Sequence, residues 1–559
     1  MQLSNNAVKV LKKRYLAKNT RSEIIETPEG MFQRVARTVA GAERDESMTE
    51  YEEKFYKIMT NLEFLPNSPT LINAGRELGQ LSACFVLPLD DSMESIFTTL
   101  RDSALIQKSG GGTGFAFSNL RPRYDLVKTT HNCAGGPVAF INIFDRALDV
   151  ISQGGVRHGA NMAVLRVDHP DILDFIVCKS QKGILPNFNI SVGVTDEFIT
   201  AVKNGRNYEL INPRDGKIVK TLKAKDVFDM IVENAWKNGE PGILFLDEIN
   251  RHNMVPHAGL IEATNPCGEQ PLLGYESCNL GSINLGRLVR VKEVDWDRLE
   301  YIVKLAVRFL DNVIDMNRYP ITQIETKTKA TRKIGLGVMG FADMLIKMNI
   351  DYDTDEAIIM ANTVMKFIRD KAIQASAELA DTRGVFPSYR GSVWHTDLNI
   401  RVRNAGLTTV APTGTLSIIA NCSSGIEPYF SKTTKKHVLN TILEQEIEFA
   451  KEDCFMTAHD IDPSWHVKIQ AAFQKHVCSA VSKTINFPHT ATKEDVKYAY
   501  LMAYKLKCKG ITIYRDKSRE EQVLTDGTQA CPECGADVVN EEGCMTCSAQ
   551  CGWSACRVA

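Results

Sequence analysis

Three features that would place the chain in a membrane, outside the cell or on nucleic acid are missing from its 559 residues. No apolar run approaches the roughly 20 residues that a transmembrane helix needs. The N-terminal residues 1–6 lack the charged and then apolar pattern of a secretory signal. Charge is balanced, with 66 Lys and Arg against 68 Asp and Glu, so no basic surface for nucleic acid is indicated. These absences favour a cytoplasmic enzyme that binds neither membrane nor nucleic acid.

The sequence also lacks the regular cysteine spacing of a secreted disulfide framework. Of its 15 cysteines, nine are scattered between Cys84 and Cys508, and six lie in the C-terminal residues 531–559. In an intracellular chain, a dense cysteine cluster is typical of metal binding or redox activity. We therefore expect the C-terminal cluster to serve one of these purposes.

Two glycine-rich segments lack what a nucleotide-binding loop requires. The segment 109–114 has no closing Gly-Lys-Ser/Thr, so we interpret it as a tight backbone crossing. The segment Gly335–Gly340 fits the pattern G-x-G-x-x-G, but a polar basic run at 327–333 precedes it where a hydrophobic strand should stand. We interpret these glycines as close-packing residues before a helix at 341–348. A nicotinamide-dependent dehydrogenase, which would rest on this pattern alone, is the less favoured alternative.

The stretch 265–269, Asn-Pro-Cys-Gly-Glu, brings an amide, a thiol and a carboxylate together within five residues. Pro266 and Gly268 disfavour a helix. If the run is extended, Asn265, Cys267 and Glu269 point to one face, because strand side chains alternate. A thiol beside a carboxylate can act as a nucleophile or as a redox centre. The alternative is a small packing cysteine in a turn.

Local patterns predict helices and an anion site elsewhere in the chain. Residues 1–80 are expected to be helical, with Thr27 and Pro28 starting one helix. Asp91 and Ser92 stand before a further helix, where an acidic or hydroxyl residue also serves as an ordinary cap. The loop 411–417 exposes backbone N–H groups before an apolar helix, which suits an anion, although ordinary capping is the alternative.

Taken together, these motifs resemble the catalytic subunit of adenosylcobalamin-dependent (class II) ribonucleotide reductases. The resemblance runs from about Arg14 to Cys556 and is carried by the 265–269 stretch with Cys278, in the order that the family shows. It implies an α/β fold, a ten-stranded α/β barrel of two half-barrels with a central finger loop. We accordingly expect a helical N-terminal region at 1–80, the barrel at 81–518, a linker at 519–530 and a Cys-rich tail at 531–559.

The resemblance implies a role for each residue of the finger loop. Cys267 is expected to carry a thiyl radical that abstracts the 3′ hydrogen of the ribose. Glu269 is expected to act as general base, and Asn265 to hold the sugar hydroxyls. Cys84 and Cys278 are expected to supply two electrons by closing a disulfide, which requires Cα atoms within about 7 Å. The product is a 2′-deoxyribonucleotide for DNA synthesis.

Ligand-binding residues also follow from the resemblance. The substrate, a ribonucleoside di- or triphosphate, is expected to contact Ser68, Ser82, Thr413, Gly414, Thr415 and Ser417. Deoxynucleotide or ATP effectors that set substrate specificity are expected at Asp91, Ser92 and Arg157. His158 stands where many members have Arg. A homodimer is expected, because relatives with such effector loops commonly dimerise.

The tail is expected to combine a zinc site with a redox shuttle. The pairs Cys531/Cys534 and Cys544/Cys547 give a C-x2-C…C-x2-C pattern, a strong zinc signal. The resemblance implies that Cys551 and Cys556 reopen the active-site disulfide by thiol exchange and that a thioredoxin- or glutaredoxin-type protein resets them. An alternative zinc set replaces Cys544 and Cys547 with Cys547 and Cys551. A non-enzymatic zinc-ribbon adaptor would explain the tail alone.

The radical source is the last open choice. Ile513-Tyr514 stands where reductases fed by a separate metallo-subunit carry adjacent tyrosines, which favours adenosylcobalamin as the cofactor. A ferritin-like radical subunit is the alternative. No Asp-x-His-x-x-Gly cobalamin-ligating motif is present, so cobalamin-contacting residues are not assigned.

Overall fold

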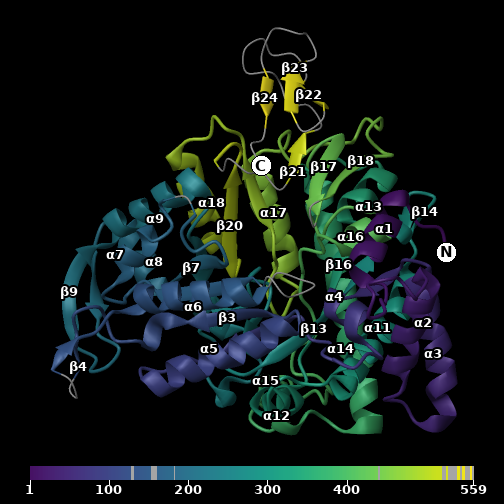
Figure 1. Cartoon of the computed structure of the whole chain (residues 1–559), viewed down its shortest axis with the longest axis horizontal. Helices are drawn as coiled ribbons and strands as arrows, with labels where there is room; N and C mark the ends of the chain where they lie inside the picture. Colours follow the sequence, from purple (N-terminus) through teal and green to yellow (C-terminus); the bar gives the residue numbers. More distant parts are fainter. Residues whose placement is uncertain are drawn as a thin grey trace.

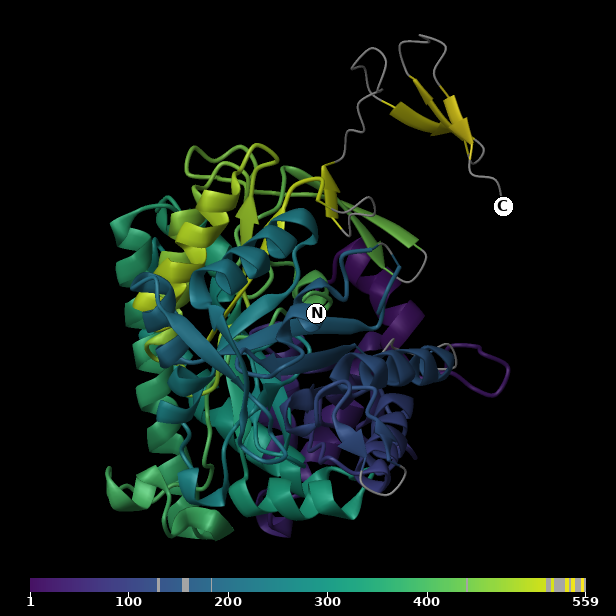
Figure 2. The same ribbon diagram turned by 90° about the vertical axis from the view of Figure 1, so that its left-hand side faces the viewer.

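The structure is a computed structural model that describes residues 1–127, 131–152, 160–181, 183–438, 441–518, 524–526, 538–541, 544–547 and 554–556. The described part is a mixed α/β molecule, as predicted, in which helices surround one large sheet (Figures 1 and 2). None of the helices in these ranges combines the length and the apolar character needed to cross a membrane.

The N-terminal 80 residues are mainly helical. The helix at Thr27 begins where the sequence predicts: Gly30 N donates to Thr27 Oγ1 at 3.1 Å, and Pro28 occupies the first turn. One strand, β1 (Phe64–Pro66), joins the large sheet. The helices are α1 (Asn5–Val10), a π-helical turn (Leu11–Tyr15), α2 (Pro28–Ala40), α3 (Asp45–Thr60) and α4 (Ser68–Asn73).

The large sheet has ten strands in the order β1-β13-β2-β3-β6-β7-β10-β20-β19, with β16 also paired to β13. Nearly all of their residues are buried, which suits strands covered on both faces. Their bounds are β2 (Cys84–Leu87), β3 (Gly112–Ala116), β6 (Asn161–Arg166), β7 (Phe188–Val194), β10 (Gly242–Phe245), β13 (Ser277–Asn284), β16 (Ile334–Met339), β19 (Thr484–Phe487) and β20 (Gly510–Arg515).

Apart from β1, which pairs antiparallel with β13, two antiparallel junctions divide the sheet into parallel sets. Strands β2, β3, β6, β7 and β10 run parallel, as do β13 with β16 and β19 with β20. The first junction places Cys84 of β2 opposite Cys278 of β13, and the second joins β10 to β20. Isolated parallel bridges, Leu336–Thr408 and Val410–Val481, extend the pairing beyond β16 toward the segment that leads into β19.

Helices pack on the outside of the sheet (Figure 1). Two buried apolar clusters form the core: one joins the N-terminal helices to β13 and β16, and the other lies between β3, β6 and β7 and their helices. The helix after β16 has the bounds that the sequence predicts. The helices are α5 (Met93–Lys108), α6 (Pro137–Ser152), α7 (Ile172–Val177), α8 (Asp196–Lys203), α9 (Ala224–Asn238), α10 (Leu246–Arg251), α11 (Trp296–Met316), α12 (Thr322–Thr331), α13 (Phe341–Met348), α14 (Asp355–Arg383), α15 (Val393–Thr396), α16 (Leu416–Ala420), α17 (Pro463–Gln474) and α18 (Lys493–Lys505).

Small hairpins and short sheets complete the described fold. They are β4 (Leu126–Val127) with β5 (Asn132–Cys133), β8 (Asn207–Ile211) with β9 (Ile218–Lys223), β14 (Val289–Arg290) with β15 (Glu293–Val294), and β18 (Thr441–Glu446) with β17 (Thr433–Val438) and β21 (Leu524–Asp526). Strand β21 lies within the segment predicted as a linker. The last sheet contains β22 (Val538–Glu541), β23 (Cys544–Cys547) and β24 (Ser554–Cys556).

Candidate active site

A short hairpin carries the stretch 265–269. Strands β11 (Ala263–Thr264) and β12 (Pro271–Leu272) pair antiparallel and leave residues 265–270 at the tip. The tip is a turn and not the extended run considered above: Gly268 adopts a φ of +81° and donates its N–H to Asn265 O at 3.0 Å. Side chains therefore do not alternate, and they divide between two sides of the hairpin. Asn265 and Glu269 are buried, whereas Cys267 is exposed.

Glycines of β3 make room for this hairpin. A Cβ atom at Gly114 would lie 1.8 Å from Thr264 O, and one at Gly112 would lie 3.1 Å from Pro266 Cγ. Only a strand without side chains at these positions can lie this close to the hairpin backbone. The interpretation of segment 109–114 as a tight backbone crossing is confirmed. On the other side, Asn189 Nδ2 of β7 donates to Pro266 O at 2.9 Å and anchors the tip.

On the buried side of the hairpin, an amide, a carboxylate and a thiol meet. Asn265 Nδ2 donates to Cys84 Sγ at 3.1 Å, and the Cys84 thiol donates to Glu269 Oε1 at 3.9 Å. Gln270 N donates to Asn265 Oδ1 at 2.9 Å, which fixes the orientation of the amide. The Glu269 carbonyl accepts from Thr409 Oγ1 at 2.8 Å and Ala480 N at 2.9 Å. These bonds hold the hairpin tip between several strands of the sheet.

A second thiol stands directly across the strand pair from the first. Cys84 and Cys278 are register partners, and directly opposed Cα atoms in antiparallel strands are about 4.5–5.5 Å apart. That separation lies within the range of about 4.4–6.8 Å that a disulfide spans. Both cysteines are present as free thiols. Burial raises the pKa of the Cys278 thiol well above its usual value, so this thiol stays protonated at neutral pH.

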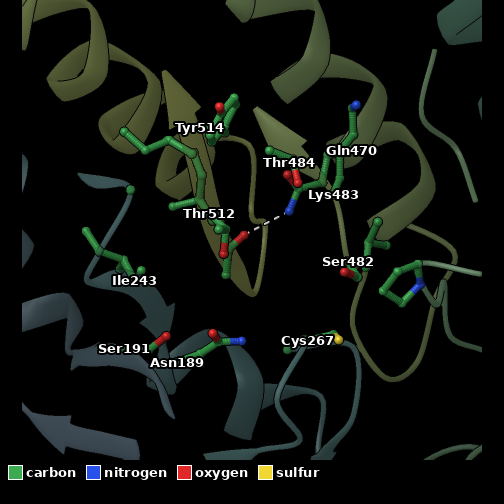
Figure 3. A pocket seen from close by; sticks show the side chains of 18 of the residues that line it. Asn189, Ser191, Ile243, Cys267, Gln470, Ser482, Lys483, Thr484, Thr512 and Tyr514 are labelled. Carbon is green, nitrogen blue, oxygen red and sulfur yellow. Dashed lines mark hydrogen bonds between the residues drawn. The ribbon is translucent and has the colours of Figure 1, made fainter. Parts of the chain in front are cut away.

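On its other side, the hairpin tip borders a cavity of about 490 Å³. Figure 3 looks into this cavity, with Cys267 on one wall and Thr484, Thr512 and Tyr514 on the facing wall. Polar side chains of β7, α17, β19 and β20 line it together with apolar side chains such as Met162 and Leu244, so a ligand there can make both kinds of contact. Cys267 is therefore the thiol of the tip that a ligand in this cavity can reach.

The glycine pattern at 335–340 is not a dinucleotide turn. Gly335 and Gly337 lie inside strand β16, where a Cβ at Gly337 would stand 2.2 Å from Thr409 O and one at Gly335 2.4 Å from Leu280 Cδ2. A dinucleotide fingerprint instead forms the turn between a strand and a helix. The prediction that these glycines serve close packing is confirmed.

Two of the segments predicted to bind substrate lie close together. The neighbouring residues Arg14 and Tyr15 link them, because Arg14 Nη1 donates to Thr415 Oγ1 at 3.3 Å and Tyr15 OH lies 2.8 Å from Ser68 Oγ. Thr413 adopts a φ of +51° and accepts from Gly425 N at 2.8 Å, so it shapes the loop before α16. Of the other predicted residues, Gly414 lies in the same loop, and Ser417 Oγ lies 2.8 Å from Ser424 Oγ. Ser82 Oγ lies 3.3 Å from Ser277 Oγ, beside the thiol pair.

The predicted effector residues are only partly described. Asp91 accepts from Arg121 Nε at 2.8 Å, and Ser92 Oγ caps α5 by accepting from Ser95 N at 3.1 Å. Arg157 lies outside the described residues. So do Cys531, Cys534 and Cys551 of the tail. Cys544, Cys547 and Cys556 lie in β23 and β24, whose register pairs Cys544 with Cys556.

Sequence reasoning missed the charged residues buried around these sites. Lys333 Nζ binds Glu276 Oε2 at 2.6 Å next to the thiol pair, and Lys483 binds Glu427 at the cavity wall. Lys333 is the last residue of the polar basic run at 327–333, and its side chain is buried because the next residue begins β16. Among the side chains that the structure describes, no cluster of His, Cys, Asp and Glu is arranged to hold a metal.

Comparison with known proteins agrees with this geometry. A family model for the "Ribonucleotide reductase, barrel domain" matches residues 82–514, and one for the "Ribonucleotide reductase, all-alpha domain" matches residues 1–79. The vitamin B12-dependent ribonucleoside-diphosphate reductase of Thermoplasma acidophilum is 48% identical over 94% of this chain and 81% of its own length. The protein of the same name from Mycobacterium tuberculosis is 46% identical over 97% and 84%.

More distant similarity extends to a differently named reductase. The ribonucleoside-diphosphate reductase subunit alpha of Chlamydia trachomatis is 27% identical over 94% of this chain and 62% of its own length. Because the two family models account for almost all of residues 1–514 and the nearer relatives match along most of their length, the chain belongs to the ribonucleotide reductase family.

Proposed function

We propose that this chain is a vitamin B12-dependent reductase that converts ribonucleoside diphosphates to 2′-deoxyribonucleoside diphosphates for DNA synthesis. The observation that carries the proposal is the hairpin tip itself: one exposed thiol facing a cavity, and a buried pair of opposed thiols with an amide and a carboxylate behind it. The two nearer relatives carry this activity in their names. Triphosphate substrates are the alternative.

The residues of the tip divide the chemistry between them. Cys267, as a thiyl radical, takes the 3′ hydrogen of the ribose and returns it to C3′ at the end of the turnover, which restores the thiyl radical. Asn265 holds the sugar hydroxyls, and Glu269 accepts the proton of the 3′ hydroxyl. The 2′ hydroxyl leaves as water, and Cys84 and Cys278 give two electrons and two protons as they close a disulfide. The ribonucleotide and two thiols thus become a deoxyribonucleotide, water and one disulfide.

The cavity beside Cys267 supports cobalamin as the radical source. Its volume of about 490 Å³ and its mixed apolar and polar walls suit the nucleoside part of adenosylcobalamin, and Cys267 borders it. When bound, adenosylcobalamin supplies a radical by homolysis of its cobalt–carbon bond. The alternative source is a ferritin-like metallo-subunit, and the presence of a single tyrosine at Ile513-Tyr514 speaks against it.

The predicted phosphate and effector residues complete the proposal. Thr413, Gly414, Thr415 and Ser417 would bind the substrate phosphates, and Ser68 and Ser82 would also contact the substrate. Asp91, Ser92 and Arg157 would bind a deoxynucleotide or ATP effector. A second copy of the chain is proposed to dock on α5, because Met93, Phe97 and Leu105 of this helix are 61%, 46% and 42% exposed.

The tail is proposed to serve turnover. Cys551 and Cys556 reopen the Cys84–Cys278 disulfide and are themselves reduced by a thioredoxin- or glutaredoxin-type protein. Cys531, Cys534, Cys544 and Cys547 hold zinc, and the set with Cys547 and Cys551 is the alternative. The sheet is proposed to close into a ten-stranded barrel within residues 81–518, which the bridges Leu336–Thr408 and Val410–Val481 support.

The proposal is tested with the purified chain alone under anaerobic conditions. Cytidine diphosphate is incubated with dithiothreitol and a panel of deoxynucleotide effectors, with and without adenosylcobalamin, and deoxycytidine diphosphate is quantified. We expect product only when the cofactor is present. Absence of product from folded protein under every effector would contradict cobalamin dependence, and product without cobalamin after addition of a metallo-subunit would support the alternative.

A further inference from the structure

The wall of the cavity carries polar groups that the proposed mechanism does not use. Glu427, Lys483 and Gln470 all line the cavity that Cys267 borders. Figure 3 shows Lys483, Gln470 and Cys267 around this cavity. Lys483 has a fully buried side chain, and the side chain of Glu427 is 24% exposed. Such groups are costly to bury and are retained when they bind each other or a ligand.

Glu427 and Lys483 form a fixed ion pair. Lys483 Nζ donates to Glu427 Oε2, and Thr484 N donates to Glu427 Oε1 at 2.7 Å. An ionised carboxylate offers about four lone-pair positions, so further acceptor capacity is left after these two bonds. Because Glu427 lines the cavity, this capacity is available to a ligand in it.

Gln470 adds a second acceptor to the same wall. Its side chain is buried, with only 1% of the residue exposed, and Nε2 donates to Gly510 O at 2.8 Å. That bond to a carbonyl fixes which end of the amide is the nitrogen. The remaining atom, Oε1, is buried and has no hydrogen-bond partner within the described part of the chain. The polar wall therefore offers hydrogen-bond acceptors to a ligand that brings O–H or N–H donors.

The other walls suit a flat apolar group. Met162 of β6, Leu244 of β10 and the aromatic ring of Phe430 line the cavity together with Pro266 and Pro412. A ligand with a planar heterocycle and a pair of neighbouring hydroxyls matches this combination of apolar faces and acceptors. An adenosine group has both parts, and a carboxylate that accepts from the ribose hydroxyls is the arrangement used in dinucleotide-binding folds.

We propose that Glu427, held in place by Lys483, binds the 2′,3′-diol of the adenosyl group and so fixes this group beside Cys267. The proposal rests on the cobalamin dependence argued above and adds to it the residue that recognises the nucleoside. Gln470 Oε1 accepts from a further donor of the same group. Loss of the diol contact should therefore weaken binding of adenosylcobalamin without touching the substrate residues.

The test compares two cofactors and three proteins. Dissociation constants for adenosylcobalamin and 2′,3′-dideoxyadenosylcobalamin are measured by spectroscopic titration with the full chain, Glu427→Gln and the control Glu452→Gln. Glu452 is exposed and is not among the residues that line the cavity. A hydrogen bond to a charged group is worth enough to change affinity by about 10- to 100-fold.

We expect the unmodified chain and Glu452→Gln to prefer the diol-bearing cofactor by about 10-fold or more, and Glu427→Gln to bind both with similar affinity. Equal affinity of the unmodified chain for the two cofactors, or full discrimination by Glu427→Gln, would overturn the inference alone. Failure of the unmodified chain to bind any cobalamin would overturn the proposed cofactor as well. Because Glu427→Gln leaves Lys483 without its counter-ion, Glu427→Gln with Lys483→Met is measured in parallel and should show the same loss of discrimination.

Discussion

The Gly114→Ala substitution should strongly lower the activity of the enzyme, because it displaces the hairpin of β11 and β12 that carries residues 265–270. Gly114 has an ordinary negative φ, so alanine fits its backbone, and only the new methyl group matters. That methyl would lie 1.8 Å from Thr264 O, whereas real contacts of this kind stay above 3.0 Å. The hairpin must therefore shift by at least the difference, 3.0 − 1.8 = 1.2 Å. A displacement of about 1 Å at a catalytic group can lower turnover about 100-fold.

The measurement is the rate of deoxycytidine diphosphate formation, accompanied by thermal unfolding. Gly112→Ala, whose methyl would lie 3.1 Å from Pro266 Cγ, should cause a smaller loss, because a side chain gives way more easily than a backbone carbonyl. Gly30→Ala in α2 is the matched control, since its methyl meets no atom closer than 3.4 Å, and it should keep full activity. Wild-type turnover by a folded Gly114→Ala variant would refute the proposed role of the hairpin position.

Three further variants test the proposed shuttle in the tail and two buried ion pairs. Cys551→Ser combined with Cys556→Ser should spare the first turnover and block repeated turnover with thioredoxin as the reductant. The measurement is the amount of product per chain over time, and repeated turnover at the unmodified rate would refute the shuttle role of the two cysteines. Lys333→Met should lower the free energy of unfolding by about 3–5 kcal/mol in denaturant titrations, because the buried Glu276 carboxylate loses its counter-ion. Lys333→Met with Glu276→Leu should restore most of this free energy, and an unchanged single variant would contradict the prediction. Burial alone raises the pKa of Glu43, but Arg308, Asn312 and Arg383 bring it to about 2. The ionised Glu43 then stabilises the fold at pH values above its ordinary pKa of 4.5, and this stabilisation of about 3 kcal/mol is lost as the pH falls toward 2. Glu43→Gln should flatten the dependence of the free energy of unfolding on pH in this range. An unaltered dependence would be inconsistent with the pairing.

The sequence allowed the chemistry of the site to be predicted better than its geometry. Cys84 and Cys278 were expected to approach, and the register of β2 and β13 places them opposite each other. The glycines at 112, 114, 335 and 337 were expected to serve packing. Segment 109–114 lacks the closing Gly-Lys-Ser/Thr of a phosphate-binding loop, and no hydrophobic strand precedes 335–340. The extended reading of 265–269 was wrong, because the positive φ that Gly268 adopts depends on the two short strands that close the hairpin.

The buried charges could not be predicted, since burial depends on long-range pairing. Lys333 and Glu276 lie 57 positions apart and meet only because β13 and β16 are neighbours in the sheet. Glu427 and Lys483 likewise come together across 56 positions. A charged residue at the edge of a strand pattern looks the same in sequence whether it faces solvent or a partner. The cavity at Cys267 could not be predicted either, because residues of five strands, helix α17 and several loops line it.

The central claim, that the opposed thiols of β2 and β13 reduce the substrate, can be tested by mapping the disulfide after one turnover. The variant that combines Cys551→Ser and Cys556→Ser is first reduced, and the reductant is then removed under anaerobic conditions. Adenosylcobalamin, an effector and cytidine diphosphate are added to the reduced protein. We predict one deoxycytidine diphosphate per chain and a new Cys84–Cys278 disulfide in the peptide map, and neither in Cys267→Ser. Product formation with Cys84 and Cys278 still reduced would contradict the account.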